Sequence, residues 1–151
     1  MYEKQEYGGA YTAFQASLAA HDFLKEKGTA SMFDEAAAYN DQMYYTGLAA
    51  LNAQDLAAAK PVFMKLKDAG YDKPAVFEAL YKLALDSDRD EALVILNEGR
   101  EKFPEDVSLL FNEINHYLQD GKLDILTGKL EKAIEKEPTN CLLYTSDAAD
   151  E

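Results

Sequence analysis

The sequence has no tryptophan, one cysteine and few residues that break helices, with 4 prolines and 8 glycines among 151 residues. A single cysteine, Cys141, excludes an internal disulfide framework and a zinc site made of four cysteines. The scarcity of proline and glycine in a chain that is 48% hydrophobic is typical of helical globular proteins and unlike low-complexity disordered chains. The length is sufficient for one domain with a buried core.

Positive charge is also scarce. The chain carries 15 Lys and Arg against 28 Asp and Glu, which gives a formal net charge of −13. Nucleic acids and anionic membrane surfaces are bound mainly through Lys and Arg, so we expect neither as a partner. No apolar run approaches the roughly 20 residues that a membrane-spanning helix needs, so we expect no membrane insertion.

Residues that carry catalysis or bind metals are few. His21 and His116 are far apart and are not spaced with cysteine or acidic residues as metal ligands, so each is interpreted as a packed or solvated histidine. The sequence contains no zinc-protease motif, glycine-rich phosphate loop or nucleophile elbow. We therefore expect no catalytic residue, no metal site and no cofactor, and predict that the chain is not an enzyme.

What the sequence does have is an internal repeat, which extends from Lys73 to Asn140. When the sequence is shifted by 34 residues, residues of the same kind coincide: Val76 with Leu110, Phe77 with Phe111, Leu80 with Ile114, Asp86 with Asp120, Asp90 with Asp124, Lys102 with Lys136 and Pro104 with Pro138. A fixed period of this size is the sequence signature of a repeat architecture.

The period and the residues that recur in it resemble the tetratricopeptide repeat (TPR), which has the signature W-x2-L-G-x2-Y, then A-x3-F, then a proline. Ala59 and Phe63 have the A-x3-F spacing, and Gly47 stands at the position of the signature glycine. The resemblance implies an all-α fold, a right-handed solenoid of antiparallel helix pairs. It divides a single repeat domain, residues 1–140, into a partial unit at about 6–28 and units at 32–72, 73–106 and 107–140.

Apolar periodicity and capping residues predict where the helices lie. Helices are expected at about 6–27, 32–53, 56–69, 73–86, 89–103, 106–119 and 123–137. Gly28 is expected to stop the first helix, and a turn is expected at Gly70. Asp55 and Asp72 are predicted caps, and Pro61 is expected to kink the helix that contains it.

Both ends of the sequence are unusual for such a protein. The partial unit at 6–28 matches only the second helix of a repeat, so we interpret Met1 as an internal methionine. The segment Cys141–Glu151 resembles a translated sequencing adapter, and we interpret it as a non-native tail rather than as a natural polar extension.

In the TPR family, the first helix of each pair lines a concave groove that binds peptides. The resemblance assigns eight residues to this groove: Tyr44, Tyr45, Leu48, Phe77, Tyr81, Phe111, Asn112 and Asn115. Aromatic rings are enriched in binding hot spots, and asparagine side chains can bind peptide amides. The alternative is that several of these rings are packed between helices, above all Tyr45 and Phe77.

The resemblance implies a protein–protein interaction scaffold that binds a peptide segment of a partner. Two alternatives remain open. The chain could be a structural module that self-associates through exposed repeat ends, or the regulatory repeats of a larger protein with a catalytic domain elsewhere. The resemblance is to TPR proteins of bacteria, many of them exported, so both the cytoplasm and the periplasm are compatible locations.

Overall fold

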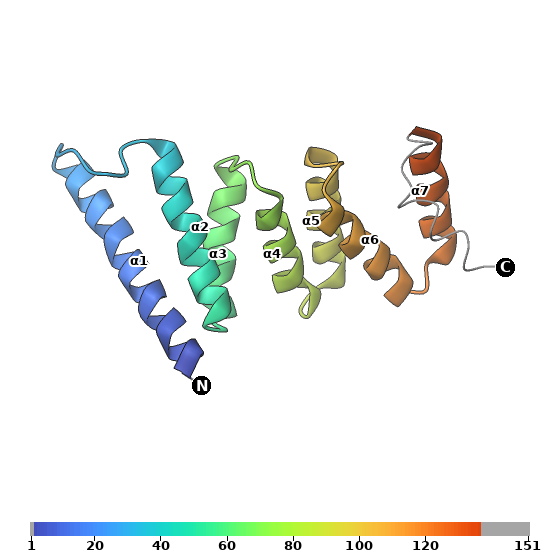
Figure 1. Cartoon of the computed structure of the whole chain (residues 1–151), viewed down its shortest axis with the longest axis horizontal. Helices are drawn as coiled ribbons and strands as arrows, with labels where there is room; N and C mark the ends of the chain where they lie inside the picture. Colours follow the sequence, from blue (N-terminus) through green and yellow to red (C-terminus); the bar gives the residue numbers. More distant parts are fainter. Residues whose placement is uncertain (1, 137–151) are drawn as a thin grey trace. The chain divides into compact units, whose positions relative to one another are not determined.

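The computed structural model describes residues 2–136, with side chains described at 6–129 and 131. Across these residues the chain is helical and has no strand, so the predicted all-α class is confirmed (Figure 1). The seven helices of this stretch are α1 (Tyr2–Glu26), α2 (Ala36–Asn52), α3 (Leu56–Asp68), α4 (Pro74–Leu85), α5 (Arg89–Lys102), α6 (Val107–Gln119) and α7 (Leu123–Lys136). Pro138 and the expected tail, Cys141–Glu151, lie outside the described residues.

The chain divides into two compact units. The first unit, Met1–Asp106, contains α1 to α5, and the second unit, Val107–Glu151, contains α6 and α7. The division falls at the boundary that the sequence places between the units at 73–106 and 107–140.

Several helix ends lie where the sequence predicts them. Helix α1 ends at Glu26, and Gly28 follows with φ at 66°, a left-handed conformation that favours glycine. Gly70 has φ at 70° after α3. The backbone N–H of Ala58 donates a hydrogen bond to the Asp55 carboxylate at 3.0 Å, which confirms Asp55 as the cap of α3.

The predicted start of α2 is wrong. The helix begins at Ala36, because residues 31–34 form a turn instead of a first helical turn. Within this turn the Ser31 N–H donates to the Asp34 carboxylate at 3.0 Å, and the Phe33 N–H donates to the Ser31 hydroxyl at 3.2 Å. Short polar side chains that bond to nearby backbone groups in this way compete with helix formation.

The predicted cap of α4 is also wrong. Helix α4 begins at Pro74, and the residue at its N-cap position is Lys73 rather than Asp72. Proline suits the first helical position because it has no N–H to leave unpaired there. Pro61 lies inside α3, which remains helical from Leu56 to Asp68, so any kink at this proline does not interrupt the helix.

Two glycines allow close packing of helix pairs in the first unit. A Cβ atom at Gly47 would lie 2.9 Å from the ring of Phe63, and one at Gly99 would lie 2.8 Å from Cβ of Phe77. The Phe77 ring also contacts that of Phe103 edge-on, with 5.8 Å between centroids. The two glycines thus allow α2 to pack closely on α3 and α4 to pack closely on α5.

The remaining fully buried apolar side chains of this unit are Ala50, Ala59, Leu66, Val76, Leu80, Ala84, Ala92 and Leu96.

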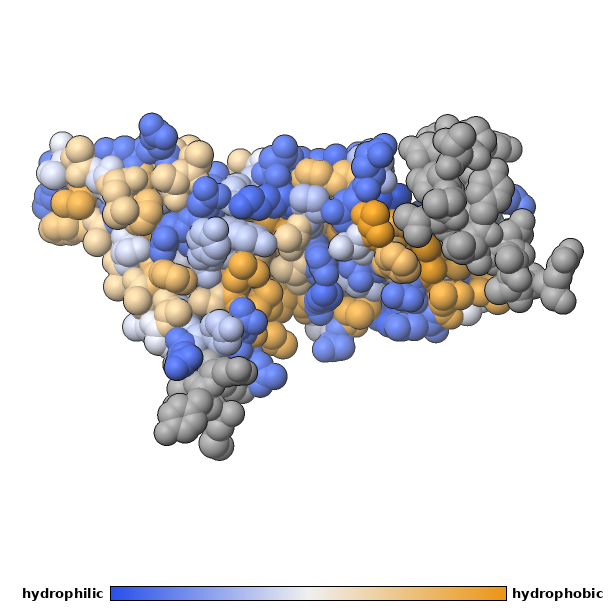
Figure 2. Space-filling view, in the orientation of Figure 1, coloured by the Kyte–Doolittle hydropathy of each residue, from blue (hydrophilic) through white to orange (hydrophobic). Residues whose placement is uncertain are grey.

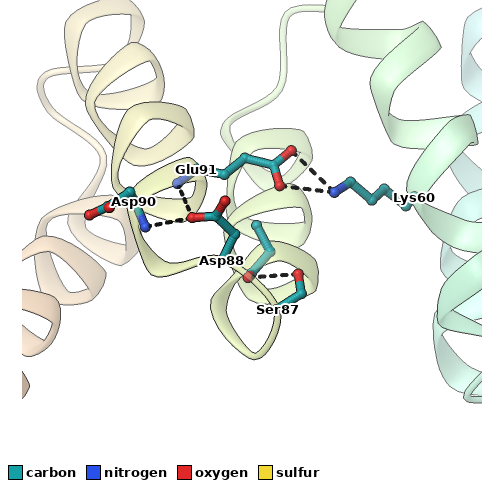
Figure 3. A network of polar contacts seen from close by, with 6 residues as sticks. Lys60, Ser87, Asp88, Asp90 and Glu91 are labelled. Carbon is teal, nitrogen blue, oxygen red and sulfur yellow. Dashed lines mark hydrogen bonds and ion pairs between the residues drawn. The ribbon is translucent and has the colours of Figure 1, made fainter.

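Two ion pairs connect α3 to α5. Lys60 Nζ lies 3.1 Å from both carboxylate oxygens of Glu91 (Figure 3), and Lys67 binds Glu98. The partners in each pair are 31 residues apart. The two lysines are therefore as far apart on α3 as the two glutamates are on α5, about two helical turns. Equal spacing in the same order means that α3 and α5 run in the same direction.

The turn from α4 to α5 is held by short-range hydrogen bonds, also drawn in Figure 3. The Asp88 carboxylate accepts from the N–H groups of Asp90 at 3.0 Å and Glu91 at 2.9 Å, so it caps α5. The Ser87 hydroxyl donates to the carbonyl of Ala84 at 3.1 Å, which satisfies a carbonyl in the last turn of α4.

In the second unit, α6 and α7 pack against each other. Lys129 on α7 forms an ion pair with Glu113 on α6, and its Nζ lies 5.1 Å from the centre of the Tyr117 ring. Burial is the largest single influence on Lys129 and would lower its pKa, but the hydrogen bond with Glu113, the charge of Glu113 and the contact with Tyr117 together raise that pKa. The contact therefore keeps the Lys129 ammonium charged.

Candidate functional site

The predicted groove residues on α2 retain exposed surface. Tyr44 and Leu48 are half-buried, and Tyr45 is 52% exposed. The alternative that Tyr45 is packed between helices therefore does not hold. These three side chains can contact a ligand without any change in the packing of the helices.

The predicted groove residues on α4, Phe77 and Tyr81, are buried, so their assignment to the groove is corrected. Phe77 is 5% exposed and Tyr81 is 3% exposed, which leaves a ligand almost no surface on either ring. Phe77 packs instead on the glycine surface at Gly99 and against Phe103. For Phe77 the alternative of a packed ring is the one that the structure supports.

Tyr44 lies at the centre of a group of aromatic and charged side chains from α2 and from the loop before α4. The centre of its ring is 5.9 Å from that of Tyr45 and 5.8 Å from that of Tyr71. Lys73 Nζ lies 4.9 Å from the centre of the Tyr44 ring and 3.6 Å from the Asp41 carboxylate. The Tyr71 hydroxyl donates a hydrogen bond to Asp41. We call Asp41, Tyr44, Tyr45, Tyr71 and Lys73 the tyrosine–lysine cluster.

The charges of this cluster are arranged around Lys73. The hydrogen bond with the Tyr71 hydroxyl is the main cause of the raised pKa of Lys73, and the Asp41 carboxylate contributes. Burial and the hydrogen bond to Asp41 raise the pKa of Tyr71, although Lys73 opposes the shift. At neutral pH the site therefore presents a charged ammonium at Lys73 and a neutral hydroxyl at Tyr71.

The side chains of this cluster are of kinds that are suited to binding. Tyrosine rings provide a large contact area at low entropy cost, and their hydroxyl groups can donate or accept hydrogen bonds. A lysine held over two tyrosine faces gains cation–π attraction, which fixes the rings in place. The cluster is thus an ordered surface with apolar faces and polar edges.

The two cluster members that lie outside the helices, Tyr71 and Lys73, are not predicted from the sequence. They belong to the loop between α3 and α4, whereas the groove assignment considered only the first helix of each pair. The available signal was the short turn after Gly70, which brings an aromatic and a basic residue immediately before Pro74.

The remaining predicted groove residues lie on α6 in the second unit. Phe111 is 54% exposed, Asn112 is half-buried and Asn115 is exposed. Residues three apart on a helix lie on one face, so Asn112 and Asn115 can act together. This part of α6 is a second candidate contact surface.

Both histidines of the chain are buried. His21 is 5% exposed and His116 is 1% exposed, so the packed alternative is the correct one for both. Among the residues with described positions, no three or more His, Cys, Asp or Glu side chains are grouped so that they could hold a metal ion.

In the described residues, no helix combines the length and the apolar character needed to cross a membrane. No protein-family model matches the chain, and no curated protein or solved structure matches it. The function is therefore inferred from the residues and their geometry.

Proposed function

We propose that the chain is a TPR-like protein, a right-handed solenoid of antiparallel helix pairs with the unit boundaries given by the sequence, and that it acts as a non-enzymatic scaffold. Its groove binds a peptide segment of a partner protein. Peptides with apolar side chains and few negative charges are the preferred ligands, because the chain itself carries a net charge of −13.

Three features support the repeat architecture. The contact of Gly47 with Phe63 pairs the signature glycine with the A-x3-F phenylalanine. Helices α3 and α5, which are the second helices of successive units in the sequence scheme, run in the same direction. The break between the two compact units coincides with a repeat boundary at Asp106. Stacked copies of one helical hairpin would have these properties.

The observation that carries the binding proposal is the tyrosine–lysine cluster. Most of its members are held in place by contacts with one another, yet Tyr45 keeps 52% of its surface exposed. Ordered aromatic side chains with accessible surface are what peptide-binding hot spots require. On α6, Phe111 and Asn115 offer a further aromatic and amide surface.

This proposal predicts that Tyr45→Ala weakens peptide binding without loss of structure. A peptide that binds the full chain would first be selected from a displayed random library, and its Kd measured by fluorescence anisotropy. We expect Tyr45→Ala to raise the Kd by about 10-fold or more, because truncation of an aromatic hot spot costs about 2 kcal/mol or more. Far-UV circular dichroism should remain unchanged.

Tyr7→Ala is the matched control, since Tyr7 is a 42% exposed tyrosine on α1 outside the cluster. It should leave the Kd unchanged. A peptide of glutamates and aspartates should not compete. If Tyr45→Ala and Tyr44→Ala both bind the selected peptides as tightly as the unmodified chain, the site is not the tyrosine–lysine cluster.

A second candidate function, self-association, is favoured by apolar side chains exposed in the second unit. Five such side chains on α6 and α7 are 46% to 56% exposed: Val107, Phe111, Leu118, Leu123 and Ile125. Figure 2 shows orange patches over α6. Apolar patches of this kind mark interaction surfaces. Repeat ends that lack a polar cap are expected to behave in this way.

Sedimentation across a range of protein concentrations tests this candidate. Self-association predicts an average mass that rises with concentration, and Leu118→Lys should suppress the rise by placing a charge on the patch. Lys122→Glu is a control for charge on the same unit. A mass that stays at that of one chain at all concentrations would exclude this function.

A further inference from the structure

A cavity of about 440 Å³ lies between the C-terminal turns of α1 and the start of α2. Its lining includes His21, Asp22 and Lys25 from α1, Phe33 and Asp34 from the loop, and Tyr39 from α2. The volume lies within the range of about 300 to 1,000 Å³ that is usual for small-ligand sites. None of these residues belongs to the tyrosine–lysine cluster, so the cavity is a separate feature of the first unit.

His21 is the buried polar group of this cavity. Its side chain is 5% exposed, and its Nδ1 atom has no hydrogen-bond partner among the described residues. The nearest acidic atom is Oδ1 of Asp34 at 3.9 Å, which is too long for a hydrogen bond. Buried polar atoms are nearly always hydrogen-bonded, and an exception in a cavity wall points to a group that the site is built to receive.

The spacing of these two groups suits a bridging donor. A nitrogen that carries at least two hydrogens can lie about 2.9 Å from both Nδ1 of His21 and the Asp34 carboxylate oxygen and donate to each. The Asp34 side chain is 50% exposed, so a donor can reach its carboxylate from solvent. The unprotonated nitrogen of an imidazole accepts such a hydrogen bond. The hydrogen bond to the carboxylate is stronger when the donor is positively charged.

The rest of the lining favours a cation. Asp22 and Asp34 bring two carboxylates against the single ammonium of Lys25, which is exposed and can extend into water. The cavity adjoins the C-terminal end of α1, where the helix dipole is negative. The charges around the cavity are thus negative on balance, as is the net charge of the chain.

The aromatic walls favour an organic cation over a hydrated ion. Phe33 and Tyr39 flank His21, with ring centroids 6.1 Å and 5.0 Å from that of the imidazole. Faces of aromatic rings attract ammonium and guanidinium groups. The Tyr39 hydroxyl donates to Asp22 at 3.5 Å, and burial together with this carboxylate raises the pKa of Tyr39, so its ring stays neutral.

We propose that this cavity binds an organic cation that carries a primary ammonium or a guanidinium group. The cation donates hydrogen bonds to the Asp34 carboxylate and to Nδ1 of His21, and its alkyl part lies against Phe33 and Tyr39. The group can belong to a free amine or to a lysine or arginine side chain of a peptide. This site does not depend on the peptide groove and can exist without it.

The experiment titrates the full chain with n-butylamine and ethylguanidine, with n-butanol as the neutral probe of similar shape. Backbone amide signals of Phe33 and Asp34 and the imidazole nitrogens of His21 are followed by NMR. We expect the two cations to shift these signals in a saturable way, whereas butanol should not. Absence of saturation by either cation at concentrations up to about 10 mM would overturn the proposal.

Asp34→Asn tests the carboxylate while keeping an oxygen that accepts from the Ser31 N–H. Glu35→Gln is the matched control, because it removes the same charge from the next residue, which does not line the cavity. Asp34→Asn should raise the Kd for n-butylamine by about 10-fold, the effect of losing a charge-assisted hydrogen bond, and Glu35→Gln should change it little. Equal weakening by both variants would mean that the cation binds through net charge alone and would refute the site.

The same titration distinguishes the two sources of the cation. The peptide acetyl-Ala-Lys-Ala-amide presents the lysine side chain on a backbone, whereas n-butylamine presents the ammonium alone. Tighter binding of the tripeptide assigns the cavity to a basic segment of a partner, and tighter binding of the amine assigns it to a small molecule. Displacement of n-butylamine by the tripeptide confirms that both use the same cavity.

Discussion

Replacing Phe63 with Ala is expected to lower the free energy of unfolding by about 3–5 kcal/mol, the usual cost of removing a buried phenylalanine ring. Phe63 is completely buried, and its ring lies where a Cβ at Gly47 would be only 2.9 Å away. Glycine at position 47 has no side chain that could fill the space that the ring leaves. Urea denaturation followed by far-UV circular dichroism measures the loss.

Phe23→Ala is the matched control for this prediction. Phe23 is 59% exposed on α1, so its truncation should change the free energy of unfolding by less than about 1 kcal/mol. The Phe63 ring also contacts the Tyr44 ring edge-on, with 6.3 Å between ring centroids. If the two variants lose similar stability, Phe63 is not the residue that locks α2 to α3.

The second large effect is expected at Gly99. Gly99→Val should destabilise the chain by about 3 kcal/mol, at the upper end of the usual cost of overpacking, because a Cβ at this position would lie 2.8 Å from Cβ of Phe77. Cβ of Phe77 is bonded directly to the α4 backbone, so it can move only if the helix moves. The fall in the urea midpoint, at unchanged slope, measures this cost.

Gly9→Val provides the comparison, since Gly9 is also inside a helix but a Cβ there would meet no atom within 4 Å. Valine is a better helix former than glycine, so Gly9→Val should be neutral or stabilising by a few tenths of a kcal/mol. If Gly99→Val proves as harmless as Gly9→Val, then α4 and α5 do not pack as closely as the structure describes.

The helices could be predicted from the sequence because their signals are local. The spacing of apolar residues, glycines with positive φ such as Gly28 and Gly70, and the cap at Asp55 depend only on neighbouring residues. The start of α2 was wrong because a turn at residues 31–34 and a helical first turn use the same kinds of polar residue. The choice between the two depends on contacts that short-range patterns do not contain.

The candidate site was predicted less completely than the helices. Tyr44 and Tyr45 were identified, but a helical position alone does not tell whether an aromatic ring faces water or a neighbouring helix, and Phe77 and Tyr81 proved to be buried. Lys73 was missed because its role depends on tertiary contacts with Tyr44 and Asp41. Burial and long-range pairing are therefore the properties that the sequence left open.

The pattern of helix contacts in the first unit affects how the chain folds. In the first unit the main helix contacts join α1 to α2, α2 to α3, α3 to α4 and α4 to α5, always partners consecutive in sequence. Such a molecule closes only short loops as it folds, which favours rapid folding kinetics. Because most of this helix packing is between neighbours along the chain, segments near an end can open while the middle stays intact.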